Sequence, residues 1–144
     1  MGGTARAARF KNQRETTMEK TAAVVGASRH RGKFGNKSLR AHQKAGYRVY
    51  PINLNPREER IEGVEVFHSL KDVPEKIDRV TVYLPPPLTL ELLDEIAEVA
   101  PSEVFLNPGT SDDAVRARAE ELGLPIKEAC SIVALGMTPS QFPD

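Results

Sequence analysis

Apolar residues in this chain occur in short unbroken runs, which are separated by clusters of glycine, proline and polar residues. The first run, at 20–26, reads KTAAVVG and has no alternation of polar and apolar positions. Such a run predicts a strand that is buried on both faces, as in a parallel sheet. Runs rich in β-branched and aromatic residues predict further strands at 47–53, 65–67, 78–84, 103–106 and 125–129.

Between these strands, apolar residues recur at the three- and four-residue spacing of helices, which predicts helices at 36–45, 89–99 and 111–122. Asn36 and Ser111 are of the types that cap helix N-termini, and we expect them to cap the first and third helices. Three consecutive prolines at 85–87 suit neither a central strand nor a helix interior, so we expect them in the preceding connection.

Strands that alternate with helices predict a parallel sheet covered by helices on both faces. The expected fold class is therefore α/β: a Rossmann-like, three-layer α/β/α domain with a mainly parallel sheet of five to six strands. Residues 20–144 have no internal repeat or low-complexity linker, so we expect them to form one domain. Residues 1–19 are expected to be a tail or a short helix.

The formal net charge of zero conceals an uneven distribution of charge along the chain. Residues 21–57 contain eight Lys or Arg and no Asp or Glu, which suggests that this half of the fold faces an anion. No stretch approaches the ~20 apolar residues of a membrane-spanning helix, so no membrane contact is expected. Cys130 is the single cysteine and the N-terminus has no apolar signal region, which favours a reducing, cytoplasmic location.

Loop-forming clusters follow the predicted strands, at the edge where parallel α/β sheets bind ligands. The first of them, at 26–36, reads GASRHRGKFGN and leads from a strand into a helix. Backbone N–H groups and the helix dipole receive phosphate at such a place, and Arg29, Arg31 and Lys33 add positive charge. Gly26 would allow a sharp turn, and Gly35 a close approach of the backbone to a ligand.

The end of the second strand limits which nucleotide the loop can hold. The dinucleotide fingerprint GxGxxG is absent, because Ala27 and Ser28 follow Gly26. The acid that would hold the ribose hydroxyls of NAD is also missing, since this strand ends in Pro51, Ile52 and Asn53. A ligand with a phosphorylated adenosine ribose fits this pattern, and both NADP and coenzyme A carry one.

The motifs GAS at 26–28, KFGN at 33–36, PIN at 51–53, PP at 85–86 and NPG at 107–109, followed by Cys130, resemble the stand-alone CoA-binding domain family. That family is similar to the nucleotide-binding domain of the succinyl-CoA synthetase α subunit. The resemblance implies phosphates at the first two motifs, adenosine beside the third, and pantetheine near the prolines. The residues expected to contact the ligand are Gly26, Ala27, Ser28, Arg29, Lys33, Phe34, Gly35, Asn36, Pro51, Asn53, Leu84, Pro85, Pro86, Asn107, Pro108, Gly109 and Cys130.

Groups that would carry chemistry are scarce in this sequence. The three histidines share no metal-ligand spacing, and no serine or cysteine lies in the motif of a nucleophile, so neither a metal site nor catalysis is expected. Cys130 is expected to be a small buried hydrophobe, with disulfide exchange with the pantetheine thiol as the alternative.

The leading functional hypothesis is a non-catalytic carrier, sensor or regulatory module that binds coenzyme A or an acyl-CoA. An NAD(P)-dependent oxidoreductase or redox sensor, and a subunit of a split acyl-CoA synthetase, are the alternatives. Nucleic acid is not expected as a partner, because the basic residues lack interleaved aromatics. The acyl group, and whether the partner is a second copy or another protein, stay open.

Overall fold

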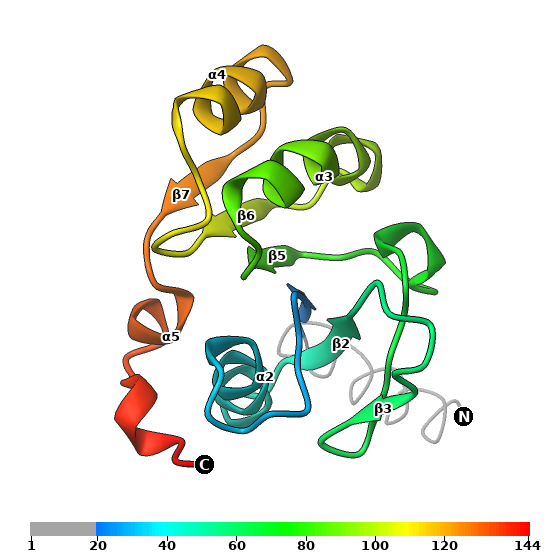
Figure 1. The fold of residues 1–144 in the computed structure, drawn as a ribbon, viewed down its shortest axis with the longest axis vertical. Helices are drawn as coiled ribbons and strands as arrows, with labels where there is room; N and C mark the ends of the chain where they lie inside the picture. The colour runs from blue at the N-terminus through cyan, green and yellow to red at the C-terminus, as the bar shows by residue number, and fades with distance from the viewer. Residues whose placement is uncertain (1–19) are drawn as a thin grey trace, which may run out of the picture.

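The structure, a computed structural model, describes residues 20–144, and the tail or helix expected over residues 1–19 lies outside them (Figure 1). One five-stranded sheet has the order β2-β1-β5-β6-β7, and every neighbouring pair in it is parallel. Its strands are β1 (Thr21–Val25), β2 (Arg48–Ile52), β5 (Arg79–Val82), β6 (Glu103–Leu106) and β7 (Ile126–Glu128). The mainly parallel sheet predicted from the unbroken apolar runs is confirmed.

Helices cover both faces of this sheet and make three layers (Figure 1). The helices α3 (Pro86–Val99) and α4 (Asp113–Glu121) lie on one face, and α2 (Phe34–Lys44) and the short α5 (Ser131–Ala134) on the other. All five residues of β1 are buried, because its side chains pack alternately into the two helical layers. Ala23 and Val25 join the core beneath α3 and α4, whereas Val24 packs with Leu39 of α2.

The segment after β2 differs from the prediction. The strand expected at 65–67 is wrong: β3 (Arg60–Ile61) and β4 (Val64–Glu65) form a separate antiparallel hairpin, and Phe67 meets Ile52 through an isolated parallel bridge. The turn between them places both Glu62 and Gly63 at positive φ, which reverses the chain after two residues. A short 3-10 helix, η1 (Leu70–Asp72), then leads to β5.

Three helix starts also differ from the sequence-based expectation. Lys33, and not Asn36, is the N-cap of α2, and Asn36 is buried inside the helix. Pro86 lies in the first turn of α3 rather than before it, because a first-turn residue needs no N–H donor within the helix. Asp112, and not Ser111, caps α4 by accepting a hydrogen bond from the Val115 amide at 2.9 Å.

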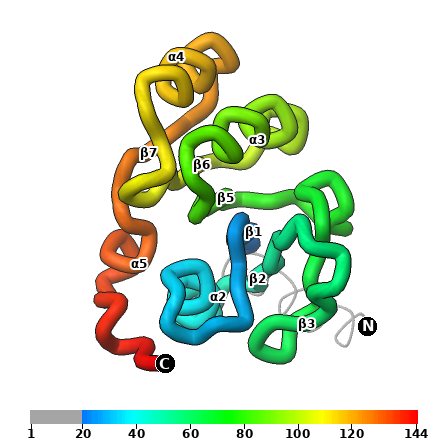
Figure 2. The backbone as a smooth tube through the Cα atoms, in the orientation of Figure 1, coloured from blue at the N-terminus to red at the C-terminus, as the bar shows by residue number. Residues whose placement is uncertain are grey.

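The C-terminal part of the described chain returns to α2. After α5, the 3-10 helix η2 (Pro139–Gln141) lies beside α2, as the tube in Figure 2 makes clear. Phe142 packs there with Ala41 and Ile132 in a small cluster separate from the main core. No helix within residues 20–144 is both long and apolar enough to cross a membrane.

His42 is a buried histidine of α2 that lies beside Arg79 at the start of β5, away from the carboxyl ends of the strands. Its Nδ1 lies 2.8 Å from the Ser38 carbonyl oxygen, and its Nε2 lies 3.2 Å from the Arg79 guanidinium. Because Arg79 can only donate, Nε2 must accept, so the ring is neutral with its proton on Nδ1. Burial, with a smaller effect of the Arg79 charge, lowers the pKa of His42 to about 4, while the Ser38 hydrogen bond and Glu103 oppose this shift.

This histidine is expected to make the fold sensitive to mild acid. The unfolded chain protonates His42 near its ordinary pKa of 6.5, whereas the folded chain resists protonation down to about pH 4. Stability is therefore lost as the pH falls from 6.5 towards 4, by about 2 kcal/mol between pH 7 and pH 5. Urea unfolding at both pH values tests this, and His42→Gln, which keeps a donor and an acceptor but does not titrate, should flatten the dependence. An unchanged pH dependence in this variant would contradict the prediction.

Candidate functional site

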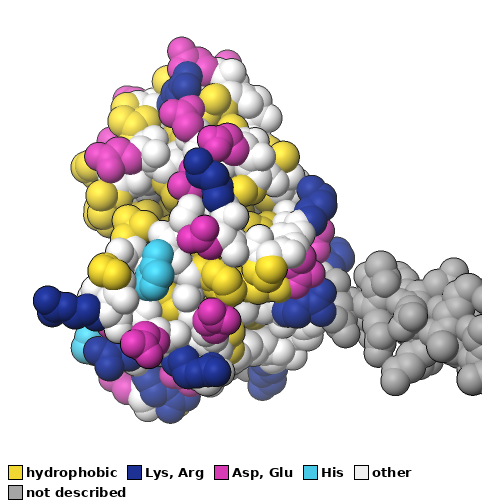
Figure 3. All heavy atoms as spheres, turned by 90° about the vertical axis from the view of Figure 1, so that its right-hand side faces the viewer, with side chains coloured by type: hydrophobic (Ala, Val, Ile, Leu, Met, Phe, Trp, Pro, Cys, Tyr) yellow, Lys and Arg dark blue, Asp and Glu magenta, His cyan; other side chains and the backbone are white. Residues whose placement is uncertain are grey.

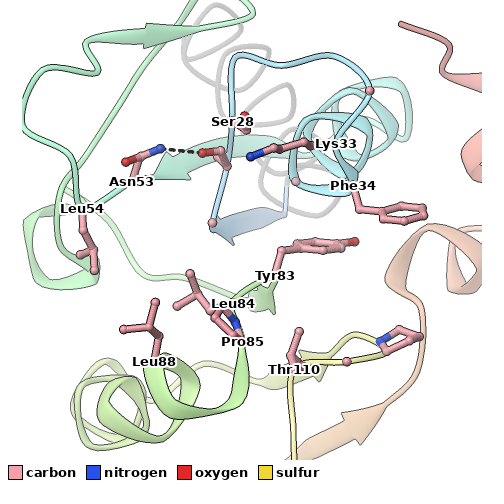
Figure 4. A pocket seen from close by; sticks show the side chains of 16 residues that line it. Ser28, Lys33, Phe34, Asn53, Leu54, Tyr83, Leu84, Pro85, Leu88 and Thr110 are labelled. Atoms are coloured by element: carbon pink, nitrogen blue, oxygen red, sulfur yellow. Dashed lines mark hydrogen bonds between the residues drawn. The ribbon is translucent and has the colours of Figure 1, made fainter.

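A cleft of about 730 Å³ opens at the carboxyl ends of the central strands β1 and β5 (Figure 4). The chain leaves β1 towards β2 on one side of the sheet and returns to form β5 on the other, so the strand order reverses here. Open α/β sheets bind ligands at this reversal. The residues that line the cleft are Gly26, Ala27, Ser28, Gly32, Lys33, Phe34, Gly35, Asn53, Leu54, Tyr83, Leu84, Pro85, Leu88, Pro108, Gly109 and Thr110.

The structure brings most of the expected contact residues to this cleft. Those that line it are Gly26, Ala27, Ser28, Lys33, Phe34, Gly35, Asn53, Leu84, Pro85, Pro108 and Gly109. Those that do not line it are Arg29, Asn36, Pro51, Pro86, Asn107 and Cys130. The contact of each residue with a ligand stays a prediction.

Two glycines let α2 start directly against the end of β1. Gly26 has a φ of 90°, and a Cβ there would lie 2.5 Å from the Tyr83 carbonyl oxygen. A Cβ on Gly35 would overlap the Gly26 carbonyl oxygen. Any larger residue at Gly35 would therefore push the helix N-terminus away from the cleft, so close packing of backbone on backbone explains this glycine.

Two asparagines hold the loop between these glycines by its carbonyl groups. The Asn53 side-chain amide donates to the Ala27 carbonyl at 2.8 Å, as drawn in Figure 4, and the Asn36 amide donates to that of Ser28 at 2.8 Å. The backbone N–H groups of Phe34 and Gly35, in the first turn of α2, have no acceptor within residues 20–144. Such free donors at a helix N-terminus suit an anionic group.

Lys33 is the cation that faces this opening. Its side chain lines the cleft and extends towards Ser28 (Figure 4), and it makes no ion pair with any residue in 20–144. The arginines of the same loop are balanced by the segment around the hairpin: Arg29 pairs with Glu58 at 2.8 Å and Arg31 with Glu62 at 3.4 Å.

The positive charge of residues 21–57 is thus partly neutralised by acidic side chains that come later in the sequence. Viewed from the side of the β3–β4 hairpin, basic and acidic side chains are intermixed and form no single basic field (Figure 3). Among the described residues that line the cleft, Lys33 is the one Lys or Arg.

Asn107 lies beneath the cleft in a buried polar network. Its amide donates to Thr81 Oγ1 at 2.8 Å and to the Val82 carbonyl at 2.9 Å, and its Oδ1 accepts from the Ser131 amide at 2.9 Å. Ser131 also hydrogen-bonds the hydroxyl of Tyr83, whose ring lines the cleft, and burial raises the pKa of this tyrosine. Asn107 therefore joins β5, β6 and α5 and is a structural support of the cleft.

Cys130 immediately precedes α5 and is partly buried. It packs on the cluster of Ala41, Ile132 and Phe142 and does not line the cleft. Both the expected small hydrophobe and exchange with the pantetheine thiol stay predictions for Cys130. Within residues 20–144 no group of three or more His, Cys, Asp or Glu is arranged to hold a metal ion.

Five lining residues escaped the sequence analysis: Gly32, Leu54, Tyr83, Leu88 and Thr110. Leu54 is 62% exposed and Leu88 is 39% exposed, although both are large apolar residues. Leu54 follows the strand predicted at 47–53, and Leu88 precedes the helix predicted at 89–99. An apolar residue beside a binding loop can serve either the core or a ligand, and the sequence alone does not separate the two. Tyr83 follows β5 directly, and an aromatic residue within a predicted strand gives no sign that its ring lines a cleft.

Comparison with known proteins gives a family. A family model described as a CoA binding domain matches residues 20–136. Subunit alpha of the ADP-forming acetate–CoA ligase II of Pyrococcus furiosus is 31% identical over 103 residues, which are 69% of this chain and 22% of that subunit. The chain therefore spans about a fifth of the length of this curated relative.

Solved structures show the same fold. A hypothetical protein from Pyrococcus horikoshii has a TM-score of 0.73 and 27% identity, covering 86% of this chain and 87% of that one. The dinucleotide-forming acetyl-coenzyme A synthetase 1 of Ca. Korarchaeum cryptofilum, solved with phosphate and ADP, has a TM-score of 0.65 and 25% identity. That match covers 80% of this chain and 27% of the synthetase chain.

Proposed function

Since this chain belongs to the CoA-binding domain family, we propose that it holds coenzyme A or an acyl-CoA in the cleft at the ends of β1 and β5, as a binding module without chemistry of its own. The observation that carries the proposal is the wall formed by the start of α2. There Lys33, Phe34 and Gly35 line one cleft, and the N–H groups of Phe34 and Gly35 have no acceptor among the residues that the structure describes. These are the donors that a phosphate group requires.

The other walls suit the rest of such a ligand. Leu54, Leu84 and Leu88 lie together at one end of the cleft, and Tyr83 lies towards the other (Figure 4). Ligand sites combine a mainly apolar lining with a few polar groups that fix orientation, in volumes of roughly 300–1,000 Å³. A ligand that carries phosphates, an adenine ring and a flexible pantetheine arm matches this division of the cleft.

Calorimetric titration with coenzyme A tests the proposal, and Lys33→Met is the most informative variant. It is expected to weaken coenzyme A binding roughly tenfold, because a charge-assisted contact to phosphate is lost. Lys37→Met, one turn along α2 and outside the cleft, is the matched control and should bind as the parent does. Equal losses in the two variants would show that the charge at Lys33 has no specific role.

NADP is the competing ligand, because it also carries a phosphorylated adenosine. A ligand raises the unfolding temperature according to its concentration and affinity. At equal concentrations, we expect coenzyme A to raise the unfolding temperature more than NADP, NAD or ADP. A larger increase with NADP would favour the oxidoreductase or redox-sensor alternative.

A second candidate is a subunit of a split acyl-CoA synthetase. It is favoured by the Pyrococcus furiosus relative, which is the alpha subunit of a ligase and is far longer than this chain. On this hypothesis the reacting groups would lie on another polypeptide. A tagged copy should then co-purify from its native cells with a second chain, and acyl-CoA formation should require both. Recovery of this chain alone would contradict the hypothesis.

A further inference from the structure

Arg40, on the second turn of α2, links the ligand site to the end of the described chain. Its guanidinium donates to the Arg31 carbonyl at 2.8 Å, in the loop of residues 27–33, here called the cleft loop. The same guanidinium donates to the carbonyls of Pro143 at 2.9 Å and Phe142 at 3.2 Å, in residues 138–144, here called the C-terminal segment. One side chain therefore holds two segments that are far apart in the sequence.

A second path leads from Arg40 to the other end of the cleft loop. The Arg40 Nε donates to Asn36 Oδ1 at 2.7 Å, and the Asn36 amide donates to the Ser28 carbonyl at 2.8 Å. Ser28 lines the cleft, whereas neither Arg40 nor Asn36 does. The cleft loop is thus braced at Ser28 through Asn36 and at Arg31 directly.

The C-terminal segment in turn fixes Arg40. Phe142 is 7% exposed, packs on Ala41 and Ile132, and lies with its ring 5.9 Å below the Arg40 guanidinium carbon. The Asp144 carboxylate lies against Gly32, which lines the cleft. If this segment were to detach, Arg40 would lose two backbone acceptors and the ring beneath it.

We propose that Arg40 is a positioning residue that couples docking of the C-terminal segment to ligand binding in the cleft. The docked segment holds Arg40, and Arg40 holds the cleft loop in the shape that receives the ligand. Coupling between two equilibria is reciprocal, so a bound ligand strengthens docking of the segment by the same factor. This inference rests on the proposed function for its ligand, coenzyme A.

A double-mutant cycle in the full chain tests the coupling. Phe142→Ala alters a residue outside the cleft, yet it should weaken coenzyme A binding roughly fivefold, and Arg40→Met should weaken it at least as much. Because both act through the same link, the double variant should bind no more weakly than Arg40→Met alone. Arg118→Met on α4, which removes ion pairs to Asp94 of α3 and to Glu121, is the control and should leave affinity unchanged.

Hydrogen exchange without ligand gives a second readout that does not depend on the proposed function. Phe142→Ala should accelerate exchange in residues 27–33, while the strands of the sheet keep their protection. The coupling is overturned if the losses of affinity in Phe142→Ala and Arg40→Met add up in the double variant. It is also overturned if Phe142→Ala leaves hydrogen exchange in the cleft loop unchanged. If the parent chain binds no coenzyme A, the proposed function fails, and the exchange result alone decides the coupling. Phe142→Leu serves in place of Phe142→Ala if the alanine variant does not fold.

Discussion

Replacing Gly35 with alanine is expected to destabilise the fold by about 3 kcal/mol and to abolish measurable coenzyme A binding. The added methyl group would overlap the Gly26 carbonyl oxygen, which is backbone at the end of a central strand and cannot rotate aside. Either the N-terminus of α2 or the turn after β1 must therefore shift, and both carry walls of the cleft. Urea unfolding and calorimetric titration measure the two effects.

Gly32→Ala is the matched control for this experiment, because Gly32 lies only three residues before Gly35, in the loop that leads into α2. The nearest atoms that its methyl group would meet belong to the Asp144 carboxylate, which is the end of a flexible side chain. We expect a change of less than about 1 kcal/mol in the free energy of unfolding. A Gly35→Ala variant as stable as the Gly32→Ala variant would show that α2 is not packed on β1 as described.

Asn107→Asp is expected to destabilise the chain by about 4 kcal/mol, although the two side chains have nearly the same size. The amide of Asn107 donates to Thr81 and to the Val82 carbonyl, and a carboxylate would face both with oxygen instead. Asn107 is 2% exposed, so water cannot compensate for the lost donors. The same measurement on Asn55→Asp, at an exposed turn, should give a change within about 0.5 kcal/mol.

Asn107→Asp also shows whether Asn107 supports the cleft or contacts the ligand. The Asn107 carbonyl accepts the Thr110 hydroxyl at 2.7 Å, and between these residues Pro108 and Gly109 line the cleft. Loss of the network should therefore weaken coenzyme A binding together with stability. A variant that loses affinity but keeps the parental stability would instead assign Asn107 to the ligand.

Most of the sheet was predictable from the sequence, because buried parallel strands appear as unbroken apolar runs. The run at 65–67 misled for a local reason: Val66 and Phe67 are apolar, but β4 ends at Glu65, and Phe67 makes only an isolated bridge to Ile52. The prediction that Pro86 precedes the helix was also wrong for a local reason. Proline is excluded from a helix interior but is tolerated in the first turn. The sequence alone does not show whether a proline lies in the first turn or before the helix.

The position of the cleft was predictable, but the role of each polar residue was not. Asn36 and Asn53 are the last residues of the motifs KFGN and PIN, and only their burial and partners distinguish Asn36, inside the helix, from Asn53 on the cleft. Arg29 and Lys33 are four residues apart in one basic loop. Only the fold brings Glu58 to Arg29 and leaves Lys33 without a carboxylate partner among the described residues.

The cleft draws its walls from four separate stretches of the chain, between Gly26 and Thr110. During folding, the pairing of β1 with β5 must close a long loop before the last of these walls can be in place, and such long-range closure slows folding. Partly folded chains would thus lack the complete cleft. Ligand capture during refolding should appear together with the native sheet, and no earlier, which makes binding a reporter of completed folding.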